Sequence, residues 1–277
     1  MTYQELWRPL TAVYDAGEAQ AIARMVLELR FGLTMADVLC GRTGDERELQ
    51  RIQQRLLAGE PVQYVIGETE FGGRRFRVAP GVLIPRPETQ ELCHWILEER
   101  GKRSEERREK MLDIGTGSGC IACTLAAEWP EAEVTAWDVS KEALAIAREN
   151  AKRTNVHVSF QRVDILALPS PLPPVQWDLI VSNPPYICEN EKAQMEPHVL
   201  EHEPHLALFV PDDDPLLFYR AIADFALRSL MPGGRLFFEI NPLYANVLAD
   251  MLSAMSYHDI ETRNDQFYKP RMIKACL

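Results

Sequence analysis

From residue 110 onward the chain alternates short apolar runs with longer amphipathic segments, and this alternation limits the possible folds more than any other feature. The apolar runs predict strands and the amphipathic segments predict helices. Strands are expected at 110–114, 133–138, 157–163, 177–182 and 234–240, and helices at 119–128, 141–153, 215–230 and 243–255. Strands separated by helices pair in parallel through right-handed crossovers, so the sequence predicts an α/β fold with a mostly parallel sheet.

Two further segments complete the predicted sheet. Residues 258–263 and 271–276 have strand-like patterns, and with the five strands above they make a sheet of seven. Met231-Pro232-Gly233-Gly234 predicts a turn that enters the strand at 234–240. The sheet and its helices are expected to form one domain over residues 91–277.

Residues 1–60 predict a small helical domain. Thr2 and Glu5 have the spacing of a capping box, and Gly59-Glu60-Pro61 ends the helical pattern. Between them, apolar residues recur at helical spacing at Ile22, Met25, Val26, Leu29, Leu49, Ile52 and Leu56. This region is either a bundle that packs on the main domain or a platform for a protein substrate, and its slightly acidic character argues against a DNA-reading module.

Residues 61–90 predict a hairpin and a stiff linker. Gly72-Gly73 supplies the turn of the hairpin. Two prolines then fix an extended path through Leu83-Ile84-Pro85-Arg86-Pro87-Glu88-Thr89 up to a helix start. Arg86 in this stretch would contact a substrate carbonyl or carboxylate, or else anchor the linker.

A glycine loop follows the first strand of the sheet. Leu112-Asp113-Ile114-Gly115-Thr116-Gly117-Ser118-Gly119 runs from a strand into a helix, and its glycines let the backbone approach a ligand closely. The spacing is G-x-G-x-G; the dinucleotide fingerprint would need a small residue where Cys120 stands. The loop therefore predicts a ligand site, although its spacing differs from that of dinucleotide-binding loops.

Acidic residues end the next two strands. Asp138 lies about twenty residues after the loop, where a carboxylate can accept both hydroxyls of a ribose. Asp164 ends the third strand, where an adenine amino group could be met. Because the carboxyl ends of parallel strands meet at one edge of a sheet, the loop and both acids are expected to share a site.

Asn183-Pro184-Pro185-Tyr186 follows the fourth strand. Two consecutive prolines cannot continue a sheet ladder, so Asn183 is expected just past the strand end on a stiff backbone. The Asn183 side-chain oxygen and the Pro184 carbonyl can accept both N–H groups of a planar amide or amino group, while Tyr186 covers its face. A plain turn after the strand is the alternative.

Composition narrows the class of protein. The net charge of −11 argues against a large nucleic-acid footprint. No signal peptide or membrane-length apolar run is present, and the six cysteines show no secreted framework, so a reducing cytoplasm is expected. Cys120 and Cys123 are interpreted as core residues, and the cluster of His198, His202 and His205 as a polar surface. No metal is predicted.

The loop, Asp138 and the Asn-Pro-Pro-Tyr stretch resemble those of class I S-adenosylmethionine-dependent methyltransferases. The resemblance implies a Rossmann-like fold, S-adenosyl-L-methionine as cofactor and S-adenosyl-L-homocysteine as product. The residues that would bind the cofactor under this resemblance are Gly115, Thr116, Gly117, Ser118, Gly119, Asp138, Asp164, Ile165 and Asn183. That family often has an aromatic residue where Ile165 stands.

The stretch from Leu83 to Thr89 resembles the hallmark of the HemK/PrmC family, which methylates N5 of the glutamine in the Gly-Gly-Gln motif of bacterial peptide-chain release factors. The resemblance implies catalytic roles for Asn183, Pro184 and Tyr186, and substrate contacts from these residues together with Pro185 and Arg86. It also implies a release factor as partner, residues 1–60 as its recognition domain, and a monomer.

Three alternatives stay open at this point. Nucleic-acid amino methyltransferases of adenine or guanine share Asn-Pro-Pro-Tyr, although the acidic balance counts against direct nucleic-acid binding. A ribosomal-protein glutamine methyltransferase differs only in the stretch from Leu83 to Thr89. A non-catalytic scaffold that binds S-adenosylmethionine would have no need of Asn183 and Tyr186.

Overall fold

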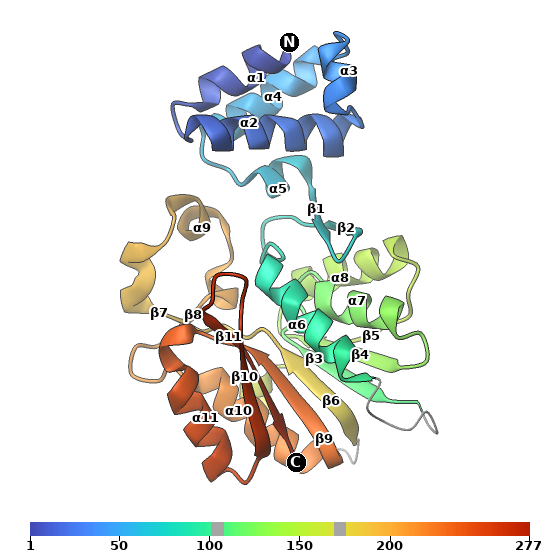
Figure 1. Cartoon of the computed structure of the whole chain (residues 1–277), viewed down its shortest axis with the longest axis vertical. Coiled ribbons are helices and arrows are strands. Elements are labelled where there is room, and N and C mark those ends of the chain that lie inside the picture. The colour runs from blue at the N-terminus through green and yellow to red at the C-terminus, as the bar shows by residue number, and fades with distance from the viewer. Residues whose placement is uncertain (101–107, 169–175) are drawn as a thin grey trace. The chain divides into compact units, whose positions relative to one another are not determined.

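The computed structural model describes residues 1–100, 108–168 and 176–277, and the chain divides into two compact units (Figure 1). Unit 1 comprises Met1–Thr69, Val78–Pro80 and Met195–Glu203. Unit 2 comprises Glu70–Arg77, Gly81–Gln194 and Pro204–Leu277. Residues 195–203 thus belong to unit 1, whereas the sequence predicted that they lie within the domain over residues 91–277. Residues 98–110 are almost all charged and of mixed sign, and the part of this run at 101–107 lies outside the described residues.

Unit 1 is a small helical bundle. Its helices in the first 66 residues are α1 (Tyr3–Leu10), α2 (Ala16–Met25), the π-helical η1 (Val26–Arg30), α3 (Met35–Leu39), α4 (Glu46–Leu57) and α5 (Val62–Ile66). Thr2 and Glu5 form the predicted capping box at the start of α1. The apolar faces meet in one core, in which Ile22, Val26 and Ile52 are buried. Helix α9 (Pro197–His202) is the part of unit 1 contributed by residues 195–203.

The hairpin predicted around Gly72-Gly73 is present. Strands β1 (Glu68–Phe71) and β2 (Arg74–Arg77) form a two-stranded sheet. Gly72 and Gly73 have φ angles of 57° and 69°, in the left-handed region that glycine adopts without strain. Helix α6 (Pro87–Glu98) then starts at Pro87, the helical position that best tolerates a missing N–H.

Unit 2 contains the seven-stranded sheet. Its strands are β3 (Lys110–Ile114), β4 (Glu133–Asp138), β5 (Ser159–Arg162), β6 (Trp177–Ser182), β9 (Leu230–Glu239), β10 (His258–Asn264) and β11 (Pro270–Cys276). The strand order is β10-β11-β9-β6-β3-β4-β5. The pairs β10–β11 and β11–β9 are antiparallel and the other four pairs are parallel, so the mostly parallel sheet is confirmed.

Helices cover both faces of this sheet, as Figure 1 shows. Helices α6, α7 (Cys120–Glu128) and α8 (Lys141–Arg153) pack on one face, and α10 (Leu217–Ser229) and α11 (Ala245–Ala254) on the other. Successive strand residues alternate between the two cores: Leu179 and Val181 belong to one and Ile180 to the other. The central strands are mostly apolar because both of their faces are covered.

Short elements complete the unit. They are the 3-10 helices η3 (Ile165–Ala167), η4 (Glu189–Gln194), η5 (His205–Ala207) and η6 (Pro242–Tyr244), and the paired strands β7 (Ile187–Cys188) and β8 (Phe209–Val210). No helix in the described part of the chain is long and apolar enough to cross a membrane.

The turn predicted at Met231–Gly234 differs in the structure. Strand β9 begins at Leu230, before this segment. Trp177 pairs with Leu230 and Leu179 with Arg235, so residues 231–234 stand opposite Asp178 alone. The register with β6 is therefore irregular across residues 231–234, while Gly233 N donates to Leu277 O and Leu277 N donates to Gly234 O.

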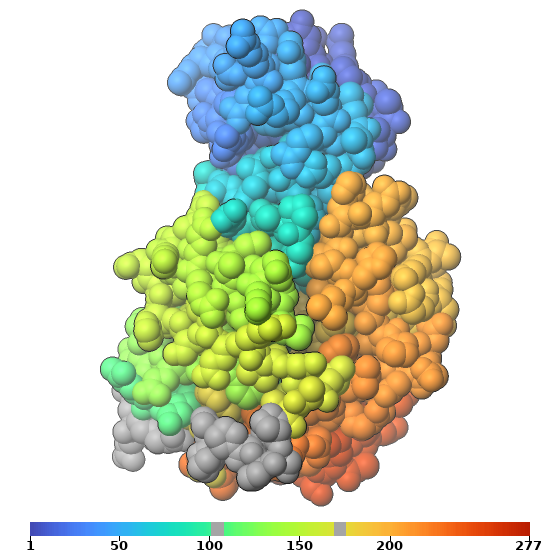
Figure 2. Space-filling model, turned by 180° about the vertical axis from the view of Figure 1, so that it is seen from behind, coloured from blue at the N-terminus to red at the C-terminus, as the bar shows by residue number. Residues whose placement is uncertain are grey.

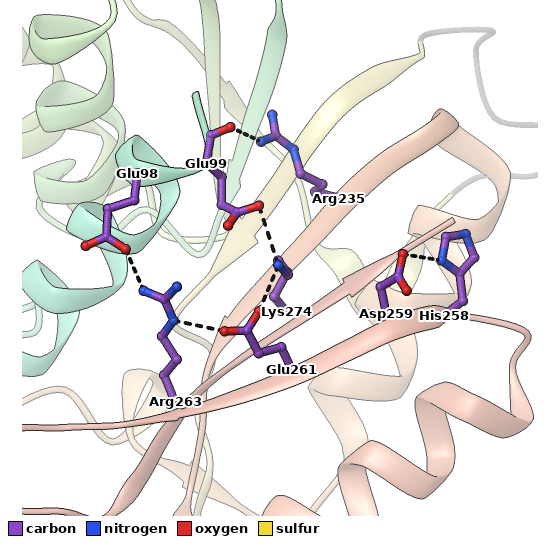
Figure 3. Close-up of polar contacts among 8 residues, drawn as sticks. All are labelled: Glu98, Glu99, Arg235, His258, Asp259, Glu261, Arg263 and Lys274. Carbon is purple, nitrogen blue, oxygen red and sulfur yellow. Dashed lines mark hydrogen bonds and ion pairs between the residues drawn. The ribbon is translucent and has the colours of Figure 1, made fainter. Parts of the chain in front are cut away.

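Charged side chains join the edge strands of the sheet to the end of α6 (Figure 3). Lys274 on β11 contacts Glu99 at 3.5 Å and Glu261 on β10 at 3.0 Å. Arg263 on β10 contacts Glu261 at 3.1 Å and Glu98 at 2.7 Å, and its guanidinium lies 4.4 Å from the ring centre of Trp95. We call Glu98, Glu99, Glu261, Arg263 and Lys274 the edge network. Ion pairs and stacking on Trp95 hold β10 and β11 against α6.

Candidate functional site

A cavity of about 320 Å³ lies at the carboxyl ends of the parallel strands in unit 2. Strands β3 and β6 are neighbours, and the chain continues from β3 to β4 on one side and from β6 to β9 on the other. Such a switch point is where open α/β sheets bind ligands. Eight of the residues singled out in the sequence line this site cavity: Gly115, Gly117, Asp138, Asp164, Ile165, Asn183, Pro184 and Pro185.

Leu83, which begins the stretch from Leu83 to Thr89, also lines the site cavity. Other walls come from segments that the sequence did not single out, and they include Val82, Pro204 and Leu206 after α9, and Phe218 and Ile222 on α10. On the face that Figure 2 shows, the green to yellow segments and the orange segment after residue 204 meet along a hollow. Apolar side chains therefore surround a few polar groups, as in sites that bind small organic molecules.

Asp113, near the end of β3, holds the glycine loop through hydrogen bonds. Its Oδ2 accepts hydrogen bonds from Thr116 Oγ1 at 2.6 Å and from Ala122 N at 3.2 Å. Burial raises the pKa of Asp113 to about 7. Its other oxygen, Oδ1, is buried and has no hydrogen-bond partner among the described residues. With a pKa of about 7, this carboxyl is partly protonated near neutral pH.

The glycine loop exposes bare backbone to the site cavity. Gly115 and Gly117 have φ angles of 73° and 54°, and a Cβ added at either would meet open space. Both positions line the cavity, so a side chain there would occupy the volume that a ligand needs. This cradle fits the close approach of a cofactor that the loop predicts.

The other loop residues face the protein. The Thr116 hydroxyl is turned to Asp113, and Ser118 O accepts a hydrogen bond from Asn150 Nδ2 at 2.9 Å. A Cβ at Gly119 would lie 3.0 Å from the Cβ of Ala147 on α8. Thr116, Ser118 and Gly119 thus shape the loop and its packing, while Gly115 and Gly117 face the cavity.

Asp138 is held by two backbone amides. Gly117 N donates to Oδ2 and Ser140 N donates to Oδ1, each at 2.8 Å. Each carboxylate oxygen retains a lone pair after these bonds, so the group can still accept two hydroxyls from the cavity. Burial raises the pKa of Asp138, and the hydrogen bonds from Ser140 and Gly117 act in the opposite direction.

Asp164 and Ile165 form the wall next to β5. Asp164 caps the 3-10 helix η3, because its Oδ1 accepts a hydrogen bond from Leu166 N at 2.9 Å. Ile165 lines the cavity with an aliphatic surface and packs on the core that α10 and α11 cover. A flat ring bound here would contact aliphatic carbon.

Asn183 follows β6 and is held through its side-chain nitrogen. Asn183 Nδ2 lies 3.2 Å from Thr89 Oγ1, and Thr89 in turn donates to Glu239 Oε2 at 2.6 Å. Asn183, Pro184 and Pro185 line the site cavity. The Asn183 carbonyl oxygen and the Pro184 carbonyl are thus the acceptors that this stretch can offer to a planar amide.

Tyr186 is anchored at both its hydroxyl and its backbone. Its hydroxyl donates to Glu239 Oε1 at 3.1 Å, and Asn241 Nδ2 donates to Tyr186 O at 3.1 Å. Burial, together with the Glu239 carboxylate, raises the pKa of Tyr186 well above its usual value. The charge of Arg271, and to a smaller extent that of Arg86 at the N-cap of α6, lowers that pKa.

Sequence reasoning missed the two residues that join these groups. Thr89 was only the last letter of a proline-rich motif, and Glu239 was one residue of a predicted strand. Glu239 does carry a signal, because it is a lone acid within the apolar run Leu236–Ile240. A buried carboxylate in a central strand needs polar partners, so it indicates a cluster of polar side chains at that position.

The cysteine and histidine clusters fall into two groups. Cys120 and Cys123 lie on α7 and are buried in the core, which confirms the interpretation of the sequence. His198 and His202 belong to unit 1, whereas His205 belongs to unit 2 and packs edge-on against Phe209. In the described ranges no group of three or more His, Cys, Asp or Glu residues could hold a metal ion.

Comparisons with known proteins define the class first. Residues 96–202 match the family model described as methyltransferase small domain. A METTL16 methyltransferase domain has a TM-score of 0.54 at 17% identity, covering 79% of this chain and 95% of that one. A Pyrococcus furiosus methyltransferase has a TM-score of 0.51 at 19% identity, covering 73% and 87%. The fold is that of class I, Rossmann-like methyltransferases.

Closer relatives define the family. A Bacteroides thetaiotaomicron protein named release factor glutamine methyltransferase is 45% identical and covers 96% of this chain and 95% of its own length. Proteins of the same name from Flavobacterium psychrophilum and Bacillus subtilis are 40% and 36% identical, and cover 96% and 95% of this chain and 94% and 93% of their own lengths. The chain belongs to the release factor glutamine methyltransferase family.

Proposed function

We propose that this protein transfers a methyl group from S-adenosyl-L-methionine to the side-chain amide nitrogen of the glutamine in the Gly-Gly-Gln motif of peptide-chain release factors. The observation that carries the proposal is the placement of Asn183 and Pro184 at the site cavity, with the Asn183 NH₂ group already engaged by Thr89. Two acceptors then remain for a substrate amide, which has two N–H groups to donate.

The cavity residues suit the proposed cofactor. Gly115 and Gly117 leave room for it along the loop, and Asp138 would accept its ribose hydroxyls. Asp164 and Ile165 would contact its adenine. When bound, S-adenosylmethionine supplies a methyl group that the sulfonium has already activated.

The protein's own contribution is alignment. A carboxamide nitrogen is a weak nucleophile because its lone pair is delocalised, so placing it in line with the methyl group matters most. Such positioning can be worth roughly 7–11 kcal/mol. Accepting both N–H groups at Asn183 and Pro184 would also stabilise the positive charge that develops on the nitrogen.

The direct test is methyl transfer by the purified protein, with labelled S-adenosylmethionine and intact release factor, or with total protein, RNA or DNA. Label is expected on the release factor glutamine. Label in nucleic acid alone would contradict the proposal and favour an amino methyltransferase of nucleic acid.

Two variants separate the proposed roles. Asn183→Ala should lower turnover about a hundredfold or more, because one orienting acceptor is lost, while cofactor affinity stays within a few-fold. Asp138→Ala should weaken cofactor binding by about 1.5–3 kcal/mol, because a charged acceptor is lost. Calorimetric titration with S-adenosylmethionine checks both; equal losses of affinity in the two variants would refute the division of roles.

We further infer that unit 1 contacts the protein substrate. A glutamine side chain alone offers few contacts, whereas a specific protein interface usually buries about 1,200–2,000 Å². Unit 1 has a surface cavity of about 370 Å³, lined by Val13, Tyr14 and His198 among others. Deleting residues 1–60 would strip the core around Val62 and Val65, so a surface substitution tests recognition more cleanly.

Val13→Asp is that substitution. It should raise the KM for intact release factor several-fold without changing kcat, because binding that is equal in the ground state and the transition state is lost. The KM for a short Gly-Gly-Gln peptide should not change. Leu39→Asp, at another exposed apolar residue of unit 1, is the matched control. Equal KM values for wild type and Val13→Asp would place recognition elsewhere.

A further inference from the structure

Glu239, Thr89 and Asn183 come from three separate segments of unit 2 and meet in one chain of hydrogen bonds. Glu239 ends β9, Thr89 lies in the first turn of α6, and Asn183 follows β6. Glu239 and Thr89 are 1% and 3% exposed, so water does not compete for the hydrogen bond between them, whereas Asn183 at the cavity is half-buried. The chain thus runs from a buried carboxylate to the side chain proposed to hold the substrate.

The hydrogen bonds impose a direction on the Asn183 amide. A threonine hydroxyl has one hydrogen, and at 2.6 Å it donates this hydrogen to the Glu239 carboxylate. Thr89 Oγ1 then has only lone pairs left, so it must meet an N–H of Asn183 and not its carbonyl. Nitrogen and oxygen of an amide are otherwise nearly interchangeable in shape, so it is this partner that decides which end points where.

The same carboxylate also anchors Tyr186, the last residue of Asn-Pro-Pro-Tyr. Its Oε1 accepts the Tyr186 hydroxyl at 3.1 Å, while its Oε2 accepts Thr89. Tyr219 on α10 donates to the Glu239 backbone carbonyl at 3.1 Å, which fixes the end of β9 itself. One buried residue therefore sets both the amide and the aromatic ring of Asn-Pro-Pro-Tyr. We call Glu239, Thr89, Asn183 and Tyr186 the site network.

We propose that Glu239 and Thr89 are positioning residues that hold the Asn183 carbonyl oxygen toward the substrate nitrogen. This inference rests on the proposed function and goes further, because it assigns the alignment of the substrate amide to residues outside Asn-Pro-Pro-Tyr. The Glu239 carboxylate polarises the Thr89 hydroxyl, which in turn polarises the Asn183 amide. In such a chain each hydrogen bond strengthens the next. The Asn183 oxygen thereby becomes a better acceptor.

Ionised Glu239 is required for this direction. A protonated carboxyl can itself donate to Thr89, and the hydroxyl is then free to donate to the Asn183 oxygen. Burial raises the pKa of Glu239 above 4.5; hydrogen bonds from Thr89 and Tyr186 and the charge of Arg271 oppose the rise, and Glu88 adds to it. Turnover should therefore fall as the pH drops through a range above 4.5.

Three substitutions test the proposal in the full-length protein with intact release factor. Thr89→Val removes the hydroxyl at constant shape and should lower kcat roughly 10–100-fold, with S-adenosylmethionine affinity within about threefold. Thr89→Ser keeps the hydroxyl and should restore kcat to within a few-fold of wild type. Glu239→Gln should lower kcat like Thr89→Val and remove the loss of turnover at low pH.

Glu99→Gln is the matched control, because Glu99 is also a buried carboxylate of unit 2 but belongs to the edge network. Its kcat per folded molecule should equal that of wild type. Unchanged kcat in Thr89→Val, or equal losses in Thr89→Ser and Thr89→Val, would overturn the proposal. A wild-type protein that methylates no release factor would instead refute the proposed function.

A measurement that does not depend on turnover separates the positioning role of Thr89 from the proposed function. In protein with ¹⁵N-labelled asparagine, the Asn183 side-chain NH₂ signal is identified by its absence in Asn183→Ala. Its hydrogens should exchange slowly with solvent in wild type and Thr89→Ser, and fast in Thr89→Val. Equal exchange rates in all three would show that Thr89 does not hold the amide, whatever the protein methylates.

Discussion

Two groups of carboxylates in unit 2 differ in what they contact. In the edge network, Glu99 and Glu261 face the ammonium of Lys274, and Arg263 pairs with Glu98 and Glu261 (Figure 3). In the site network, Glu239 accepts hydrogen bonds from the hydroxyls of Thr89 and Tyr186.

From this difference we infer that the edge network contributes to stability and the site network to alignment of the substrate amide. An ion pair attracts in every direction and tolerates small movements, so it suits the attachment of edge strands to a helix. A hydroxyl between a carboxylate and an amide fixes which atom donates and which accepts. We therefore expect variants of the edge network to lower stability without changing kcat, and variants of the site network to lower kcat at a smaller cost in stability.

The largest effect on stability is expected from Lys274→Met. The methionine keeps the apolar stem but removes the cation beside Glu99, whose side chain is only 9% exposed. Removing one partner of a buried ion pair costs about 3–5 kcal/mol, because the other charge stays buried. Urea unfolding measures the loss, and kcat per folded molecule should not change.

A second substitution serves as the control for Lys274→Met. Adding Glu99→Gln neutralises the carboxylate that Lys274→Met leaves behind, and most of the lost stability should return. If Lys274→Met lowers kcat more than its folded fraction explains, the two networks are coupled and the comparison fails.

Asp113 provides the next test, because its partners are a hydroxyl and a backbone amide. Its pKa is raised from 3.8 to about 7, so between these values the folded protein holds a proton that the unfolded chain releases. Stability therefore falls as the pH rises through this window, by at most about 4 kcal/mol. Asp113→Asn cannot titrate, so its stability relative to wild type should rise from pH 4 to pH 7.

Urea unfolding of both proteins at several pH values measures this difference, in which the titration of all other groups cancels. Asp113 supports the glycine loop through Thr116, so S-adenosylmethionine affinity reports whether the loop is intact in the variant. A difference that stays constant with pH would mean that Asp113 is ionised throughout.

The sequence was sufficient for most of the fold, because strand and helix periods and glycine positions are local signals. Lys110–Ile114 and Trp177–Ser182 were predicted to the residue, and Asp138 and Asn183 were expected at the edge where they lie. Thr89 and Glu239 could not be paired in this way. They are 150 residues apart and meet only through tertiary packing, which no local pattern encodes.

The smallest effect is expected from Glu261→Gln. Its side chain is 46% exposed and contacts both Lys274 and Arg263, so the substitution removes one charge from the edge network and keeps an acceptor oxygen. Exposed ion pairs contribute about 0–1 kcal/mol, and added salt screens them. The loss should therefore be under 1 kcal/mol by urea unfolding at low salt and smaller still at high salt, with kcat unchanged. Glu239→Gln is the same chemical change in the same sheet, yet it should act on kcat. If both variants lower kcat alike, the carboxylates contribute through the general field of unit 2, and the direction imposed through Thr89 is not what aligns the substrate.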